Sequence, residues 1–238
     1  MKSQSQFLMI ALAVSFTMAL ALTVALICVS YIKDSPNEPP VQETDTETQA
    51  TAEPSDTTQD TSKDTLPPDQ SGGLRFSSNG NGTCRLISIG SCTDACVVIP
   101  EYSPAGDRVT EITERAFYNC TTVTAVQIPS SIRSIGELAF AACPNLVYIS
   151  VSAQNPFFCD MEGILYTADL RTLILYPAMR AGSTLTIRAV TSEIADMAFY
   201  NCAYLEHVTY TGTPEDWEEI RIGYKNYSLT AASKSFAS

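Results

Sequence analysis

The sequence predicts a mainly β solenoid with short helical turns, preceded by one transmembrane helix and a disordered stalk. Three observations predict this fold class: an uncharged apolar run near the N-terminus, a following stretch without aromatic residues, and a 23-residue unit that recurs along the rest of the chain. A unit of this length cannot bury an apolar face alone, so the copies stack and bury their faces against one another.

The apolar run covers residues 7–32 and contains no charged residue. A helix of this length is roughly 39 Å long, which exceeds the ~30 Å hydrocarbon core of a bilayer. A cleaved signal peptide is the alternative, but its apolar region is only about 7–15 residues long and a small-x-small site follows it. Residues 27–31 offer no such site, although residues 19–21 (Ala-Leu-Ala) could be cut. An uncleaved transmembrane anchor is therefore the favoured interpretation.

The charges that flank the apolar run predict its orientation. Lys2 and the amino terminus lie on one side, and Lys33 and Asp34 lie on the other. Positive charge favours the cytoplasmic side, so residues 1–6 are predicted to be a short cytoplasmic N-terminus. The protein is then expected to cross the cell membrane once, with its C-terminal domain outside the cell.

Residues 33–83 are predicted to form a disordered, acidic stalk rich in Thr and Pro. Residues 34–73 contain no aromatic residue, and they carry ten acidic residues against one basic residue, Lys63, a net of 1 − 10 = −9 out of a formal −12 for the chain. Such a segment buries too little apolar surface to offset the entropy of ordering it. The acidic balance also argues against nucleic acid as a partner, because phosphates would be repelled.

Seven apolar slots define the repeat, and their spacing is the same in three copies. The copies are Ile112, Ala116, Phe117, Cys120, Val123, Val126 and Ile128; then Ile135, Ala139, Phe140, Cys143, Leu146, Ile149 and Val151; then Ile194, Ala198, Phe199, Cys202, Leu205, Val208 and Tyr210. Extending this register predicts five short strands, at residues 97–99, 126–128, 149–151, 185–187 and 208–210. Each Ala-Phe pair is expected on a helical turn, with the Phe inserted between neighbouring units.

Residues 126–143 (Val-Gln-Ile-Pro-Ser-Ser-Ile-Arg-Ser-Ile-Gly-Glu-Leu-Ala-Phe-Ala-Ala-Cys) closely resemble the BspA-like leucine-rich repeat family, and residues 89–100 look like the first unit of such an array. The resemblance covers about residues 84–225. It implies a short, curved leucine-rich-repeat solenoid on a cell-surface protein, often adhesive and without a shared catalytic site. The repeat ectodomain is accordingly predicted at residues 84–229. Arg188 and Ala195 depart from the family pattern, so the coil that contains them is expected to be less regular.

Residues 155–182 do not fit the repeat. Two apolar runs, Ile164–Thr167 and Thr172–Tyr176, flank four residues that include Asp169, which suggests an inserted β-hairpin. A similar Asn-Pro…Gly…Tyr-Pro unit occurs in the family, here at residues 155–177. The unit is interpreted as an irregular coil in preference to a protrusion that faces a ligand.

A C-terminal cap is predicted at residues 211–225. Thr213 is suited to be the N-cap of a helix with Pro214 at its first position and Asp216 completing a capping box. Trp217 and Ile220 would then cover the last coil. Residues 230–238 are small and polar and are predicted to form a flexible tail.

The cysteines divide into two groups. Cys120, Cys143 and Cys202 share one repeat slot, which favours a stack of buried free thiols over disulfides. The other cysteines of the ectodomain, which allow three disulfide pairings, are Cys84, Cys92, Cys96 and Cys159. One histidine and no paired Cys-x-x-Cys pattern argue against zinc, so no metal or cofactor is predicted.

The predicted function is binding of an extracellular protein or glycan ligand by a membrane-anchored surface protein. The expected contact surface is the exposed strand face, which carries Gln127, Tyr148, Ser150, His207 and Thr209. Tyr148 and His207 are expected to stack in register, apart from the intervening coil. A spacing element of the cell envelope without a ligand is the alternative. An enzyme is a remote third reading, because the only histidine lies near a core cysteine and no catalytic set converges.

Overall fold

The structure is a computed structural model that describes residues 70–237. The predicted cytoplasmic segment 1–6, the anchor 7–32 and most of the stalk, through residue 69, lie outside the described residues. Within residues 70–237, none of the helices is both long and apolar enough to cross a bilayer.

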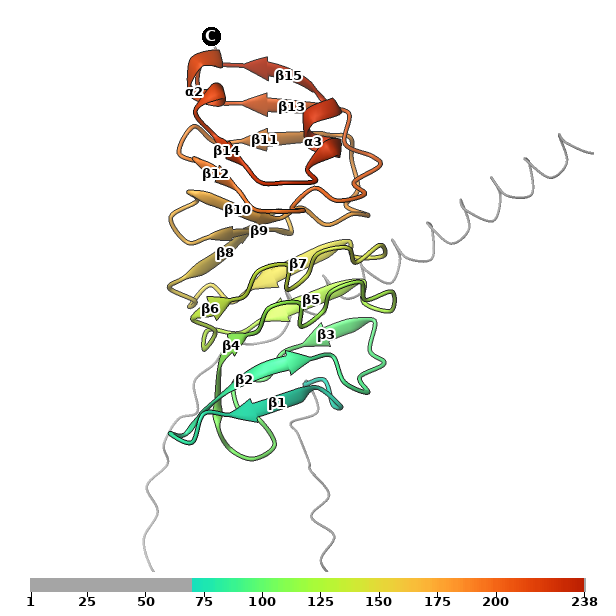
Figure 1. Cartoon of the computed structure of the whole chain (residues 1–238), viewed down its shortest axis with the longest axis vertical. Coiled ribbons are helices and arrows are strands. Elements are labelled where there is room, and N and C mark those ends of the chain that lie inside the picture. Colours follow the sequence, from blue (N-terminus) through green and yellow to red (C-terminus); the bar gives the residue numbers. More distant parts are fainter. Residues whose placement is uncertain (1–69, 238) are drawn as a thin grey trace, which may run out of the picture.

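The described chain is a solenoid whose coils stack along one long axis (Figure 1). Strands on one side of the coils, here called the front row, form two parallel sheets. These are β3 (Cys96–Val98), β5 (Ala125–Ile128) and β7 (Tyr148–Val151), then β11 (Thr184–Ile187), β13 (His207–Tyr210) and β15 (Ser233–Phe236). All five predicted strands are present, in β3, β5, β7, β11 and β13.

Strands on the other side of the coils, here called the back row, form two further sheets. The first contains β1 (Arg75–Ser78), β2 (Thr83–Ser88), β4 (Arg108–Ile112) and β6 (Ser134–Ile135). The second contains β14 (Arg221–Ile222), β12 (Glu193–Ile194), β10 (Thr172–Leu175), β9 (Ile164–Thr167) and β8 (Phe158–Met161). The helices among residues 70–237 are α2 (Pro214–Glu218) and α3 (Tyr227–Ala231). The mainly β solenoid is therefore confirmed.

Register between coils follows the repeat slots. Val126 of β5 lies beside Val97 on one side and Ile149 on the other, and Leu185 of β11 lies beside Val208 of β13. Because side chains alternate along a strand, these slots point inward together and form the core.

The aromatic slot is also occupied as predicted. The rings of Phe117 and Phe140 stack with centroids 5.1 Å apart, and Tyr176 stacks on Phe199 at the same distance. Tyr176 thus takes the phenylalanine position in the irregular unit. The buried apolar residues nevertheless form two separate clusters, which divide at this unit.

The irregular unit is both a hairpin and the beginning of a coil. Strands β8, β9 and β10 form an antiparallel meander, and β10 also pairs in parallel with β12. Its last strand is therefore a member of the back row, which explains how a hairpin can be inserted without ending the solenoid.

The folded region extends beyond the predicted limits of 84–229 at its N-terminal end. Strand β1 lies within the predicted stalk, yet it pairs antiparallel with β2, and Leu74 just before it is buried. Phe76 packs against the first core cluster, so β1 covers the apolar end of the array.

Residues 230–237, most of the predicted flexible tail 230–238, are instead part of one more coil at the C-terminal end. Strand β15 pairs in parallel with β13, and Leu229 is fully buried. This coil escapes the repeat pattern because Ile222 lies 28 residues after Ile194, whereas the repeat spacing is 23.

The predicted cap helix is present, but it does not end the array, because the extra coil follows it and packs against it. The capping box between Thr213 and Asp216 is formed at the start of α2. Trp217 is 6% exposed and packs edge-on against Tyr210, as expected, but it also contacts the ring of Phe236 in β15. The tryptophan therefore fills an internal position between α2 and the last two coils.

The thiols of the repeat slot are free, as predicted, and Cys143 and Cys202 are buried. Cys84, Cys92 and Cys159 are free thiols as well. The core is therefore held by packing and by main-chain ladders at these positions.

Candidate functional site: a cleft at the interruption of the back row

The strand-face residues predicted to bind a ligand fall into two groups in different sheets. Gln127, Tyr148 and Ser150 lie on β5 and β7, whereas His207 and Thr209 lie on β13. The irregular unit and β11 separate the groups, so the structure does not stack Tyr148 on His207.

Tyr148 is packed against the irregular unit. A Cβ added to Gly163 would lie 2.4 Å from its ring, so the ring rests directly on the glycine backbone. Its hydroxyl lies 3.5 Å from Oδ2 of Asp160. Burial and the nearby carboxylate both raise the pKa of Tyr148. Much of this side chain is thus used in joining the two halves of the solenoid.

His207 is held by the last strand. Its Nδ1 lies 2.8 Å from Oγ of Ser233, and its Nε2 lies 2.9 Å from Oγ of Ser235. The Ser235 hydroxyl also donates to Oγ1 of Thr209 at 3.1 Å. Hydroxyls occupy both ring nitrogens, so no carboxylate orients the imidazole in the way that a catalytic triad requires.

Strand β7 of the front row is joined to the irregular unit at the point where this unit interrupts the repeats. The amide of Ile149 donates to the carbonyl of Gly163 at 3.0 Å, and the amide of Val151 donates to Oδ1 of Asp160 at 2.8 Å. A side-chain carboxylate therefore takes the place of a strand carbonyl at this step.

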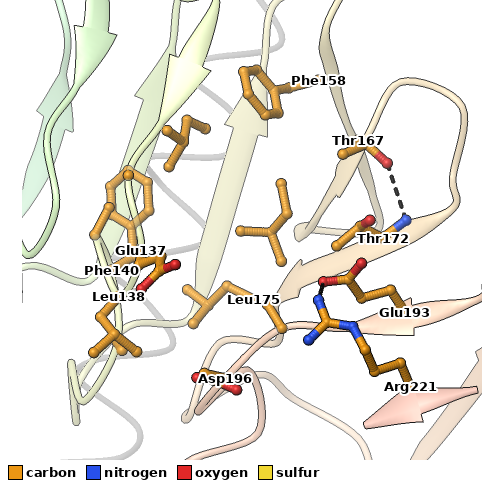
Figure 2. A pocket seen from close by; sticks show the side chains of 16 residues that line it. Glu137, Leu138, Phe140, Phe158, Thr167, Thr172, Leu175, Glu193, Asp196 and Arg221 are labelled. Carbon is orange, nitrogen blue, oxygen red and sulfur yellow. Dashed lines mark hydrogen bonds and ion pairs between the residues drawn. The ribbon is translucent and has the colours of Figure 1, made fainter. Parts of the chain in front are cut away.

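The back row is open at the same step. Strand β6 pairs with β4 on one side only, and β8, the edge strand of the second back sheet, pairs with β9 on one side only. A cleft of about 310 Å³ lies here. One wall is formed by residues 135–141, and the other by residues of β8, β9, β10, β12 and β14. Figure 2 shows Glu137, Leu138 and Phe140 on one side of it and Thr172, Glu193 and Arg221 on the other.

The cleft has an apolar interior and an acidic rim. Its apolar lining is provided by Ile135, Leu138, Phe140, Phe158, Ile174 and Leu175. Three carboxylates and one guanidinium surround it, and Arg221 is ion-paired to Glu193. Oδ1 of Asp196 accepts the amide of Tyr224 at 2.9 Å. Within residues 70–237, Glu137 has no ion pair, so its charge is available to a ligand.

Leu138 and Phe140 present main-chain N–H groups on the wall of the cleft. One repeat earlier, the equivalent groups of Arg115 and Phe117 donate across to the next coil, at 3.1 and 2.8 Å. No acceptor in the described part of the chain takes the N–H of Leu138 or of Phe140. Sequence reasoning missed this cleft because it arises from a coil that is absent, and the repeat slots on both sides of it look normal.

A family model describes this architecture. The BspA type leucine-rich repeat region matches residues 99–159, in 6 copies. Residues 99–159 are BspA-type leucine-rich repeats. The matched residues include the wall of the cleft formed by the second repeat, residues 135–141. No curated protein matches the chain.

Solved structures that are similar to this chain come from several bacteria. The pneumococcal vaccine antigen PcpA is 20% identical, with a TM-score of 0.47, over 56% of this chain and 32% of that chain. A leucine-rich repeat protein from Eubacterium ventriosum is 23% identical, with a TM-score of 0.43, over 54% and 40%. A leucine rich cell surface protein from Faecalibacterium prausnitzii is 16% identical, with a TM-score of 0.35, over 64% and 71%. The match covers less than half the length of the first two.

Within residues 70–237, no group of three or more His, Cys, Asp or Glu side chains is placed to hold a metal ion. What the cleft offers chemically is an apolar interior, two main-chain donors and a carboxylate rim. This combination suits recognition of a ligand that carries hydrogen-bond acceptors and positive charge.

Proposed function

We propose that this protein is a membrane-anchored binding module of the cell surface and that its ligand is an extracellular protein. The observation that carries the proposal is the cleft between β6 and β10, where an apolar interior, free main-chain donors and the Glu137 carboxylate meet. Residues 7–32 would anchor the chain in the membrane, and the acidic stalk would hold the solenoid away from it.

A binding role is favoured over catalysis by the state of the reactive side chains. Burial raises the pKa of Cys143 and of Cys202 to about 12, so both thiols stay protonated and unreactive near neutral pH. His207 is fixed between two serine hydroxyls. None of these groups lines the cleft.

A protein ligand is favoured over a glycan by the chemistry of the cleft walls. Its ring side chains, Phe140 and Phe158, are largely buried and leave no broad exposed ring on which a sugar could stack. Unpaired main-chain donors are instead suited to peptide carbonyls. The strand face with Gln127, Tyr148 and Ser150 stays a second predicted surface.

The test is capture of extracellular-matrix proteins and of glycans by the full chain, purified in mild detergent and immobilised. Thr172 lines the cleft, whereas Thr186 is an exposed residue of β11 in the front row. We expect Thr172→Trp, which fills the cleft, to abolish capture of a protein ligand. We expect the matched Thr186→Trp variant to retain it.

Two results would contradict the proposal. Capture that survives Thr172→Trp and is lost in Gln127→Ala/Ser150→Ala would move the site to the front row. No capture by the unmodified chain would favour a spacing element of the envelope. Surface location is tested separately by protease treatment of intact cells, which should release a fragment that contains residues 84–229.

A further inference from the structure

We infer that the cleft binds a short peptide segment of a partner protein, which takes the place of the missing coil and carries a basic side chain. This inference rests on the proposed function and names the class of ligand. It is carried by three features of the wall formed by residues 135–140: its hydrogen-bonding groups, its backbone conformation and its charge.

The first feature is the ladder that joins successive coils. The N–H groups of Arg115 and Phe117 donate to the carbonyls of Glu137 and Ala139. The carbonyl of Ile112 accepts the N–H of Gly136 at 2.8 Å. Each coil therefore has one carbonyl acceptor and two N–H donors that face the next coil. The next coil supplies the one N–H and the two carbonyls that bond to them.

The second repeat has the same acceptor and the same two donors, and in the described chain these groups have no hydrogen-bond partners. Ile135, Leu138 and Phe140 are the residues 23 positions after Ile112, Arg115 and Phe117. All three line the cleft. In the described chain, no donor reaches the Ile135 carbonyl and no acceptor reaches the other two N–H groups.

The second feature is backbone conformation, which fixes the direction of these groups. Arg115 has φ 56° and Leu138 has φ 57°, so the two turns follow the same path. The N–H groups of Leu138 and Phe140 must therefore point out of their coil as those of Arg115 and Phe117 do. They point toward the position that a following coil would occupy.

The C-terminal half shows that the solenoid normally satisfies these donors. The N–H of Met197 donates to the carbonyl of Tyr224 at 2.9 Å. At Phe199 the register is irregular, and Oδ1 of Asn226 accepts its N–H at 2.9 Å. A side-chain acceptor thus bonds to the N–H where no main-chain carbonyl is in position. The N–H groups of Leu138 and Phe140 are the exception, because neither kind of acceptor reaches them in the described chain.

The geometry specifies the ligand residue by residue. It must supply an N–H to the Ile135 carbonyl, a carbonyl one residue later to Leu138, and a carbonyl two residues after that to Phe140. The residue between those two carbonyls corresponds to Leu138, and the equivalent Met197 has φ 55°. Glycine is favoured at this place because it adopts positive φ without strain.

The third feature is charge, and it selects a partner over the chain's own N-terminal region. The rim carries three carboxylates against one guanidinium, and Glu137 is free of an ion pair among residues 70–237. Residues 34–69 hold ten acidic residues and one lysine, so they would be repelled. A lysine or arginine beside the glycine would instead meet Glu137.

The test uses the full chain in detergent micelles, labelled with ¹⁵N at leucine and phenylalanine, and the probe acetyl-Ser-Val-Gly-Lys-Gly-Ala-Val-amide. We expect the probe to shift the amide signals of Leu138 and Phe140. The amide of Phe117, which is already bonded to Ala139, should not move. Replacing the second glycine of the probe with valine should abolish the shifts.

A matched pair of variants tests the charge. Glu114 is the residue 23 positions before Glu137, outside the cleft and paired only with Arg115 at the surface. Glu137→Lys should weaken binding of the probe by up to about fivefold, the range that an exposed ion pair supplies. Glu114→Lys should leave it unchanged.

The outcomes separate the two proposals. Protection of the Leu138 and Phe140 amides from hydrogen exchange before any probe is added would show that the chain's own residues occupy the cleft, and would overturn the inference. Absence of probe binding, together with capture of matrix proteins that Thr172→Trp abolishes, would overturn the peptide mode and leave the binding function standing. Equal binding by the glycine probe and by its valine variant would overturn the inference that the peptide adopts the conformation of a repeat coil.

Discussion

At the scale of single residues, the cysteine slot shows how one side chain serves the repeat. Sγ of Cys143 donates to the carbonyl of Phe117 at 3.0 Å, and Sγ of Cys202 lies 3.6 Å from the carbonyl of Tyr176. Each thiol thus satisfies a carbonyl of the preceding coil while it fills a small apolar space. Cys120 occupies the same slot but is only half-buried.

This difference predicts the order in which the thiols react. Burial holds the pKa of Cys143 and Cys202 near 12, against an ordinary value of 9.0, so at pH 8 only roughly one molecule in ten thousand carries either thiolate. Iodoacetamide at pH 8 should therefore modify Cys120 before Cys143 and Cys202 in the folded chain. Peptide mass spectrometry measures the order. Equal rates in the folded chain would contradict the burial of the slot, and equal rates after addition of denaturant are the expected control.

At the scale of elements, two buried asparagines replace main-chain partners where the repeat is interrupted. The side-chain amide of Asn155 donates to the carbonyls of Pro129 and Ile132, at 2.9 and 3.0 Å. Its oxygen accepts the amides of Phe157 and Phe158. Asn226 does similar work in the last coil, where its Nδ2 donates to the carbonyls of Ala195 and Gly223.

Asn155→Ala should destabilise the protein by about 2–4 kcal/mol, because the N–H groups of Phe157 and Phe158 lose the side-chain oxygen that accepts them and the carbonyl of Ile132 loses a donor. Denaturant unfolding followed by tryptophan fluorescence and circular dichroism measures the change. Asn145 is the control, since it is exposed and makes one side-chain bond, to the carbonyl of Thr121. Asn145→Ala should cost less than about 1 kcal/mol. A similar loss in both variants would argue against the bridging role of Asn155.

The regular elements were predictable from sequence, and the elements at the interruptions were not. Slots such as Phe117 and Phe140 recur 23 residues apart because each fills the same space, so pattern alone places the strands around them. Leu229 and Phe236 fill the same core, but the helix α2 lengthens their coil and shifts their register. The tail prediction for residues 230–238 failed for that reason.

The candidate site was beyond sequence reasoning for a different physical cause. Exposure can be predicted from alternation, and that selected Gln127, Tyr148 and His207. Whether two exposed residues share a sheet depends on the hairpin between them, and the bonds of His207 depend on β15. The cleft depends on main-chain N–H groups at Leu138 and Phe140 that have no acceptor in the described chain, and no local sequence pattern reveals this.

At the scale of the whole molecule, the division of the core predicts two units of stability. Phe117 belongs to the first cluster and Phe199 to the second. Truncating Phe117 to alanine should cost about 3–5 kcal/mol in its own half. Because repeats mainly stabilise their neighbours, amides of β11 and β13 should keep their protection from hydrogen exchange.

Phe199→Ala is the reciprocal variant, and it should expose β11 and β13 while β3 and β5 stay protected. Exchange measured by mass spectrometry on the full chain distinguishes the halves. Uniform loss of protection along the chain in both variants would mean that the array unfolds as one cooperative unit.

The uneven joining of the two rows also has a mechanical consequence. At the step beside the irregular unit, β7 is tied to that unit by the bond from Ile149 to Gly163 and by the Asp160 carboxylate, whereas β6 pairs with β4 and has no strand partner on its side facing the irregular unit. A load that bends the array toward its front would open this step before any other. Under tension the molecule would flex as two stiff blocks about a single compliant turn, and whatever filled that turn would lock it.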